Sequence, residues 1–202
     1  MGDTIDKIAV LLACVLSLFG DGYYCYQSAT GTITPTLATW VVFEVGSLLS
    51  LATYLRYNRK KHQLVSNVAN FADPVVVAVV LAFVATAPRV DAKFRFWNFI
   101  CLGIALAAAA VWRITRSDIE ANIVSQFVMI VGYAPTVLGM IRERRNAESF
   151  PMWIAGLAIA LLLLIPPVRH RNWLGVLYIG RAAVCIVILL AVMTYFQYFE
   201  PR

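Results

Sequence analysis

The chain alternates long apolar runs with short polar connections. A membrane-spanning α-helix needs about 20 consecutive, mainly apolar residues, and seven runs reach or approach that length. None of the connections is long enough to form a soluble domain. The pattern therefore predicts an all-α integral membrane protein with seven transmembrane helices, at residues 7–27, 36–56, 66–87, 96–113, 119–141, 150–167 and 173–198.

Local sequence signals mark several of the predicted helix ends. Residues 117–120 read Ser-Asp-Ile-Glu, the pattern of a capping box, in which the serine and glutamate side chains bond to free backbone N–H groups. Pro88, Pro166 and Pro167 stand where the third and sixth helices are expected to stop. We expect the fifth helix to begin at this box.

Composition agrees with a membrane protein. Hydrophobic residues make up 61% and charged residues 14% of the chain, whereas soluble domains carry about 25% charged residues. The net charge of +6 does not indicate nucleic-acid binding, because the basic residues lie in short loops between apolar runs, as membrane topology requires. We expect the bilayer and a small molecule as partners, and no nucleic acid. A homo-oligomer and a monomer are both left open.

Signatures of enzymes and cofactors are missing from the sequence. The four cysteines lie in apolar segments without CxxC spacing. His62 and His170 lie in basic loops without a second ligand at metal spacing. The chain also lacks a glycine-rich phosphate loop. We therefore expect no metal, no cofactor and no enzymatic activity.

A weak internal repeat relates the two halves of the chain. Superposing Trp40 on Trp153, an offset of 113 residues, also brings Thr36 onto Ser149. Each half then holds three helices, and one intervening helix gives both halves the same orientation in the membrane, as in a parallel repeat. The predicted units are a first triple-helix bundle (residues 1–95), a linker helix (96–116) and a second bundle (117–202).

A second pattern surrounds Pro135. Residues 132–136 read Gly-Tyr-Ala-Pro-Thr and are followed by a basic turn at 142–145, then Glu148, Ser149 and Trp153. This stretch resembles the PQ-loop pattern of the SWEET and PQ-loop transporter superfamily, with Thr136 in place of the glutamine. Residues 34–40 resemble the first loop of bacterial seven-helix SWEET-like proteins.

The resemblance implies two triple-helix bundles joined by a linker helix. Pro135 is then a candidate hinge, because a proline inside an apolar helix frees a backbone carbonyl. In the first half Gly22 stands at the equivalent position, so we expect Gly20 and Gly22 to supply flexibility there.

Ionisable residues inside apolar runs are candidates for function, because each costs about 2.5–3.5 kcal/mol on insertion scales. They are Asp21, Glu44, Asp73 and Arg181, and the weaker polar companions are Asn67, Asn70, Gln126 and Tyr133. Burial that raises a carboxyl pKa is what a proton-coupled carrier needs. Asp21 and Glu44 are therefore candidates for proton coupling, with a place in the headgroup region as the alternative for Asp21.

Asp73 precedes Pro74, and the 14 residues from 74 to 87 are too short to span a membrane alone. The third helix therefore either continues through Pro74 or breaks there, leaving Asp73 as the cap of a half-helix. SWEET proteins hold their substrate between polar residues of the third and seventh helices. The resemblance maps that role to Asp73 or Asn70, and to Arg181, whose charges put a neutral sugar in doubt.

These observations predict a transporter of the cell (inner) membrane that moves a small polar solute, such as a sugar, vitamin or organic acid, by alternating access. Asp73 and Arg181 are the leading candidates for substrate contact or a gate. Asn70, Glu44, Gln126 and Tyr133 are expected to line the site. The alternative is a membrane module of the same fold that transports nothing, such as a sensor, a scaffold or a complex subunit.

Overall fold

The computed structural model describes residues 2–58, 68–92, 96–115 and 117–199. Asn67 and His62 lie outside these residues. The described chain is helical and contains no strand. Its helices are α1 (Gly2–Ala29), α2 (Leu37–Asn58), α3 (Val68–Ala85), α4 (Phe96–Thr115), α5 (Asp118–Gly132), α6 (Ala134–Glu143), α7 (Phe150–Leu163), α8 (Ile165–Arg169) and α9 (Trp173–Tyr198).

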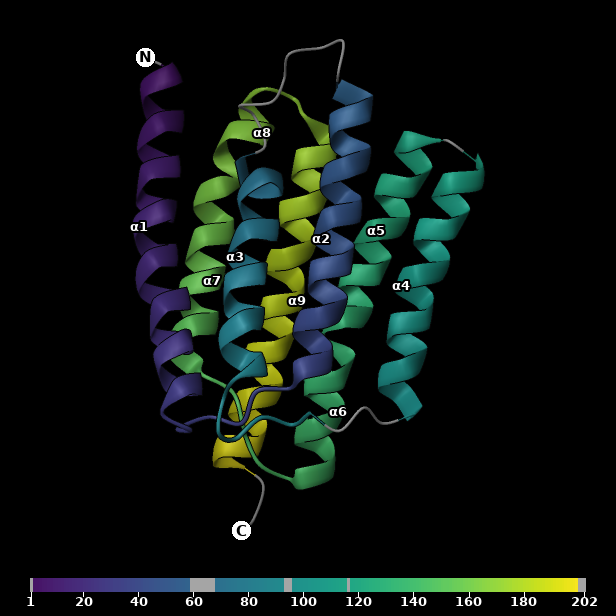
Figure 1. Cartoon of the computed structure of the whole chain (residues 1–202). Coiled ribbons are helices and arrows are strands. Elements are labelled where there is room, and N and C mark those ends of the chain that lie inside the picture. Colours follow the sequence, from purple (N-terminus) through teal and green to yellow (C-terminus); the bar gives the residue numbers. More distant parts are fainter. Residues whose placement is uncertain (1, 59–67, 93–95, 116, 200–202) are drawn as a thin grey trace.

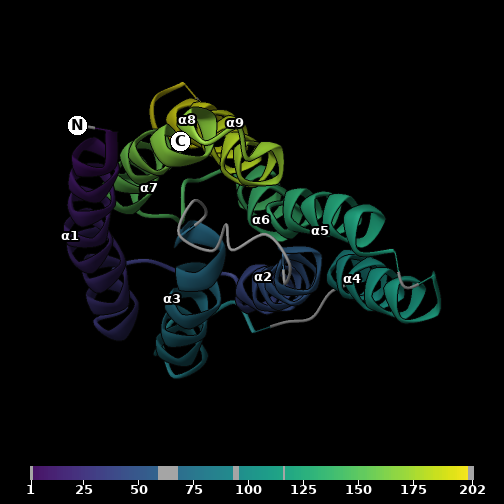
Figure 2. The same cartoon turned by 90° about the horizontal axis from the view of Figure 1, so that it is seen from above.

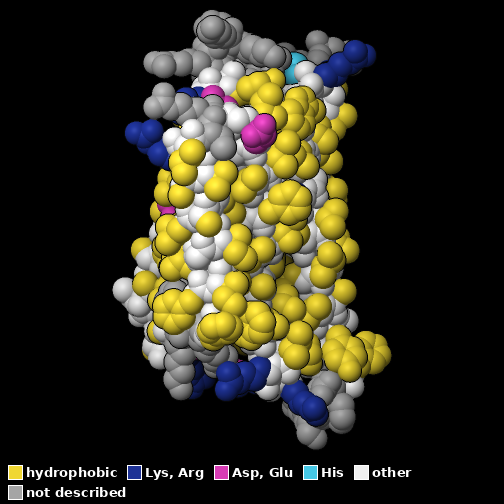
Figure 3. Space-filling view, turned by 90° about the vertical axis from the view of Figure 1, so that its right-hand side faces the viewer, with side chains coloured by type: hydrophobic (Ala, Val, Ile, Leu, Met, Phe, Trp, Pro, Cys, Tyr) yellow, Lys and Arg dark blue, Asp and Glu magenta, His cyan; other side chains and the backbone are white. Residues whose placement is uncertain are grey.

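Seven helical segments are long and apolar enough to cross a membrane, which confirms the predicted number of helices. Two of them are composite: α5 with α6 forms one segment (Asp118–Glu143), and α7 with α8 forms another (Phe150–Arg169). Figure 3 shows a broad hydrophobic band on one face, with most Lys and Arg side chains near the two ends of the bundle. This distribution indicates a membrane-embedded protein.

The long helices run along one common direction, and the two chain termini lie at opposite ends of the bundle (Figure 1). We call these the N-terminal end and the C-terminal end. Helix α2 packs against α5 and α3, and α7 packs against α1 and α9. Smaller contacts join α1 to α3 and α5 to α9, while α4 lies outside, against α5 and α2 (Figure 2).

Three loops meet at the C-terminal end. The backbone N–H of Thr34 donates to the carbonyl of Ala147 at 3.2 Å, so the loop after α1 is joined to the loop after α6. Pro35 and Leu37 exchange backbone hydrogen bonds with Asp91, which follows α3. The first of these bonds joins the two halves of the chain, and the others join loops within the first half.

The helix ends differ from prediction in their details. α5 begins at Asp118, directly after Ser117 as expected, but the Ser117 side chain makes no capping hydrogen bond, so the predicted capping box is wrong. Asp118 instead accepts a hydrogen bond from Trp112 Nε1 and pairs with Arg56 at 3.3 Å. The start of α5 is therefore joined through Asp118 to α4 and α2.

Two prolines have different effects on their helices. Pro74 lies inside α3, which continues from Val68 to Ala85, so the alternative in which the helix breaks there is wrong. Pro135 stands in the first turn of α6, and a single residue, Tyr133, separates this helix from α5. The expected interruption near Pro135 is therefore present. Pro166 and Pro167 do not end their helix directly but lie within α8.

Two glycines allow helices from opposite halves to approach closely. α1 continues without a break through Gly20 and Gly22, and a Cβ at Gly20 would lie 2.9 Å from the Ala155 Cβ of α7. A Cβ at Gly132 of α5 would lie 2.6 Å from the Phe43 ring of α2. Both positions therefore hold glycine because a side chain would collide with the neighbouring helix.

A polar seam lies between α2 and α5. The side-chain amide of Asn122 donates to the Ser50 carbonyl at 3.2 Å and to the Thr53 hydroxyl at 3.0 Å, and these residues are fully buried. Gln126, one turn further along α5, donates to the Asn122 carbonyl at 3.0 Å. Hydrogen bonds between buried helices stabilise their association because lipid offers no alternative partner.

Candidate solute-binding cavity

A cavity of about 410 Å³ lies in the middle of the bundle. Its wall comes mainly from α1, α3, α7 and α9 and is largely apolar. The lining extends from Val68, at the start of α3, to the indole rings of Trp40 and Trp153 near the C-terminal end. A volume of this size falls in the range of about 300–1,000 Å³ found for small-molecule sites.

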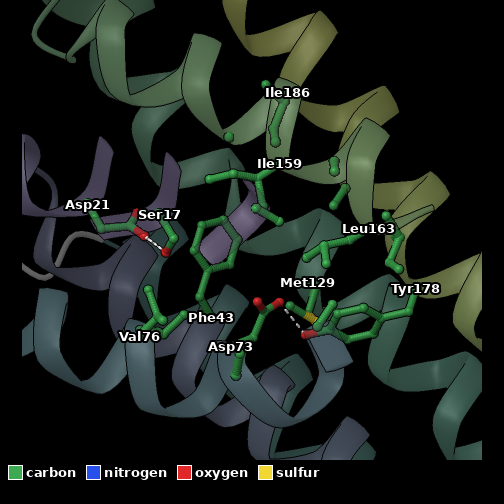
Figure 4. Close-up of a pocket in the computed structure, with 18 of the residues that line it drawn as sticks. Ser17, Asp21, Phe43, Asp73, Val76, Met129, Ile159, Leu163, Tyr178 and Ile186 are labelled. Atoms are coloured by element: carbon green, nitrogen blue, oxygen red, sulfur yellow. Dashed lines mark hydrogen bonds between the residues drawn. The ribbon is translucent and has the colours of Figure 1, made fainter. Parts of the chain in front are cut away.

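Asp73 lies in this wall on α3. The hydroxyl of Tyr178, on α9, donates to Asp73 Oδ2 at 2.6 Å, and Figure 4 shows the two side chains meeting at the pocket. Tyr178 is almost completely buried. A carboxylate with one strong donor retains further capacity to accept hydrogen bonds, so Asp73 can receive a donor from a solute.

Arg181 lies in the same wall, less than one turn after Tyr178 on α9. Its Nε donates to Gln126 Oε1 at 3.2 Å, and its guanidinium carbon lies 5.3 Å from the centre of the Tyr178 ring. Within the described residues no ion pair joins Arg181 to Asp73 or to another carboxylate. The guanidinium is thus buried beside an amide and an aromatic ring, and most of its N–H donors have no carboxylate partner.

Two further predicted residues line the cavity. Asp21, on α1, accepts a hydrogen bond from the hydroxyl of Ser17 one turn earlier (Figure 4). Tyr133, the residue between α5 and α6, packs with its ring centre 4.7 Å from Phe43 and 5.8 Å from Trp153. The interruption beside Pro135 therefore borders the cavity directly.

Three predicted lining residues lie elsewhere. Asn70 is buried on α3, and Glu44 is partly buried on α2, but neither belongs to the cavity wall. Among the described residues, Asn70 Oδ1 and Glu44 Oε2 have no hydrogen-bond partner. Gln126 lies behind the wall, where it orients Arg181. Hydropathy placed these residues inside helices, but it does not determine which side of a helix faces a cavity.

Glu148 is a further site residue, which the sequence pattern did not indicate. Its side chain is 6% exposed, and its Oε2 accepts hydrogen bonds from the Tyr24 hydroxyl at 3.1 Å and from Trp153 Nε1 at 3.3 Å. The Tyr24 oxygen itself accepts from Trp40 Nε1 at 3.1 Å. Glu148 lies in a polar loop, so apolar runs gave no signal for its burial. Its place between a basic turn and Trp153 was the available signal.

Burial raises the pKa of Glu148 to about 7, although the hydrogen bonds from Trp153 and Tyr24 act in the opposite direction. Glu148 therefore changes charge near neutral pH. The group of Trp40, Tyr24, Glu148 and Trp153 closes the cavity at the C-terminal end, and we call it the aromatic–carboxyl cluster.

The described residues contain no group of three or more His, Cys, Asp or Glu side chains placed to hold a metal ion. The candidate site is therefore an apolar cavity with two acidic residues and one arginine in its wall.

Comparisons of the chain with protein-family models, with curated proteins and with solved structures found no match.

Proposed function

We propose that this protein is a membrane transporter that moves a small polar solute by alternating access. The observation that carries the proposal is the cavity between the helices, which presents Asp73 and Arg181 in an otherwise apolar wall. Burying an ionisable group inside a membrane is costly, and such groups usually mark a solute or ion pathway. A scaffold protein is expected to pack its helices tightly and to lack such a cavity.

Arg181 favours a solute with an anionic group. Its neighbours include the oxygen of Gln126, the side chain of Tyr133 and the ring of Tyr178, which compensate the charge less well than a carboxylate does. A carboxylate of the solute would supply the missing partner, while the aromatic wall would accept its apolar part. Organic acids and acidic vitamins are therefore better candidates than neutral sugars.

We also propose that the chain contains two triple-helix bundles joined by α4. The packing of α1 on α7 and of α5 on α2 supports this arrangement, since each joins the first helix of one half to the second helix of the other. Gly20 contacts Ala155, and Gly132 contacts Phe43. These two glycine contacts are related by nearly the same offset as Trp40 and Trp153.

We further propose that the protein is a SWEET-like member of the PQ-loop superfamily, located in the cell (inner) membrane. The proline-divided helix and its position beside the cavity support this proposal. Thr136, which replaces the glutamine of the pattern, hydrogen-bonds to Thr39 of α2 at 2.8 Å in the buried core. In this proposal Pro135, with Gly20 and Gly22 in the first half, forms the hinge.

The direct test is solute binding by the purified chain. A ligand that binds the folded protein alone raises its thermal midpoint by mass action, so sugars, amino acids, vitamins and organic acids can be compared in one panel. We expect stabilisation by compounds that carry a carboxylate. Uptake of those compounds into proteoliposomes then tests transport itself.

Matched variants assign the effect to the cavity. Arg181→Gln and Asp73→Asn should each abolish uptake, whereas Arg142→Gln, at an exposed arginine outside the cavity, should leave it unchanged. Stabilisation lost in Arg181→Gln alone would identify the anion-binding partner. A folded protein that neither binds nor transports any member of the panel would contradict the proposal and favour a sensor, scaffold or complex subunit.

A further inference from the structure

The aromatic–carboxyl cluster joins three helices through one carboxylate oxygen. Glu148 precedes α7, and its Oε2 receives the Trp153 indole N–H of that helix and the Tyr24 hydroxyl of α1. The hydroxyl oxygen of Tyr24 receives the indole N–H of Trp40 from α2. A change in the charge or position of Glu148 therefore acts on α1, α2 and α7 together.

Glu148 also lies between two spaces. Trp40 and Trp153 form the wall of the large cavity at its C-terminal end. On its other side, Glu148 lines a small polar pocket among the loops of that end, together with Thr34, Asp91 and other residues. Water can approach the carboxyl through the polar pocket, while the aromatic rings separate the carboxyl from the solute cavity.

Among the described residues, the small polar pocket and the hydrogen-bond partners of Glu148 include no cation that would hold it ionised. The titratable groups near it are Tyr24 on α1, Asp91 after α3 and Glu143 at the end of α6. Glu143 pairs with Arg145 at 2.9 Å. Tyr24 and Trp153, which donate to Glu148, belong to a hydrophobic core cluster that also contains Trp40, Val84, Leu189 and Met193.

We propose that Glu148 is a proton-binding site that closes the C-terminal end of the cavity, and that its protonation makes the opening of this end depend on pH. The proposal rests on the proposed transport function. A proton from water in the small pocket adds to the carboxylate when the cluster closes, and it returns to water when the end opens. Only the O–H bond of the carboxyl group forms and breaks.

The direction in which pH acts on the C-terminal end follows from the burial of Glu148. In the closed cluster the pKa of Glu148 is about 7, whereas the ordinary glutamate pKa is 4.5. Opening at neutral pH therefore releases the proton. Acidification between these two values favours the closed end, and a rise above pH 7 favours the open end.

Infrared difference spectra of the full chain in lipid nanodiscs can test proton binding directly. We expect the C=O band of a protonated carboxyl group to titrate with a midpoint near pH 7. The band should be absent from the titration of Glu148→Gln and unchanged in Glu143→Gln, a nearby carboxylate in an exposed ion pair. A band that persists in Glu148→Gln, or a midpoint at the ordinary glutamate value, overturns the proposal.

A second variant covers the case in which Glu148→Gln does not fold. Tyr24→Phe removes a donor to the ionised carboxylate, so the midpoint of the band should move to higher pH. Tryptophan emission reports the cluster itself: replacing Trp97, Trp112 and Trp173 by Phe leaves Trp40 and Trp153 as the only tryptophans. Their emission should change along the same titration, and an unchanged midpoint in Tyr24→Phe contradicts the assignment.

Uptake measurements separate this proposal from the transport function. We expect uptake to change with the pH at the C-terminal end in the wild type and to lose this dependence in Glu148→Gln. Uptake that does not depend on this pH, or that keeps the same dependence in Glu148→Gln, overturns the proton-linked closure and leaves the transporter intact. A normal titration of Glu148 without uptake of any solute overturns the transport function, but not the proton-linked closure.

Discussion

Tyr24 and Glu148 lie 124 residues apart in the chain and share a 3.1 Å hydrogen bond in the buried core. Each belongs to a different half of the molecule. The bond joins α1 to the loop that precedes α7. The Tyr24 hydroxyl makes two hydrogen bonds at the C-terminal end, because it donates to Glu148 and accepts from Trp40.

Replacing Tyr24 by Phe should destabilise the protein. The change leaves the buried Trp40 N–H without its acceptor and removes one donor from Glu148, and an unsatisfied buried polar group costs about 1–3 kcal/mol. We expect a lower thermal midpoint in detergent or nanodiscs. Tyr23→Phe is the matched control, because the adjacent Tyr23 is 45% exposed and should tolerate the change. Equal midpoints for the two variants would contradict this role of Tyr24.

Stability should fall as pH rises through neutrality, and Glu148 should account for part of the fall. Its pKa of about 7 in the folded protein lies above the ordinary value of 4.5, so the folded state binds the proton more tightly than the unfolded state. The associated stability is complete below about pH 4.5 and is lost as pH rises through 7. At 1.36 kcal/mol per pH unit, the difference amounts to about 3 kcal/mol at most.

The measurement is the thermal midpoint from pH 5 to pH 8 in wild type and Glu148→Gln. The wild type should lose more stability over this range, because the glutamine cannot ionise. Glu143→Gln should follow the wild type. Parallel curves for wild type and Glu148→Gln would mean that Glu148 does not titrate in this window.

The number and limits of the spanning segments could be predicted from the sequence, because length and hydropathy decide whether a helix can cross a membrane. The side of each helix that faces the cavity could not be predicted from the sequence. Helices α7 and α9 are apolar on every side, since one side meets lipid and the other meets protein. The cost of a buried charge singles out Asp73 and Arg181, but it singles out Glu44 equally, and Glu44 lies outside the wall.

Gly20→Ala should destabilise the protein, whereas Gly22→Ala should not. A methyl group at Gly20 would lie 2.9 Å from Ala155 Cβ, and a methyl group at Gly22 meets nothing within 4 Å. Overpacking typically costs about 1–3 kcal/mol, and alanine gains about 1 kcal/mol of helix propensity over glycine at both sites. Thermal midpoints of the two variants isolate the collision, and a Gly20→Ala protein as stable as Gly22→Ala would show that α1 and α7 can separate at no cost.

Pro135→Ala should join α5 and α6 into one continuous helix. An alanine at this position supplies an N–H that can donate to the Val131 carbonyl, and a proline inside a helix costs about 3 kcal/mol. We expect a higher thermal midpoint together with slower solute exchange, because the interruption beside Tyr133 would be lost.

Pro151→Ala is the control for this change. Pro151 is exposed in the first turn of α7, where a missing N–H has no helical partner. Its replacement should alter neither stability nor exchange. Wild-type exchange rates in Pro135→Ala, at equal expression, would assign Pro135 a static kink and exclude a hinge.

Glu148 could not be placed from the sequence for a different physical reason. Its surroundings combine residues from α1, α2 and the loop before α7. These residues are too far apart in the sequence for a local sequence pattern to show that they meet. The predicted internal repeat pairs Trp40 with Trp153. It gives no signal for a carboxylate at position 148, because the matching position in the first half is Pro35.

The polar seam between α2 and α5 determines which parts of the molecule can separate. In lipid a hydrogen bond between Asn122 and Ser50 or Thr53 has no water to replace it, so pulling these helices apart exposes several unsatisfied groups at once. The contact of α1 with α7 at Gly20 and Ala155 involves no polar side chain. We therefore expect any relative motion of the helices to separate α1 from α7 before it separates α2 from α5.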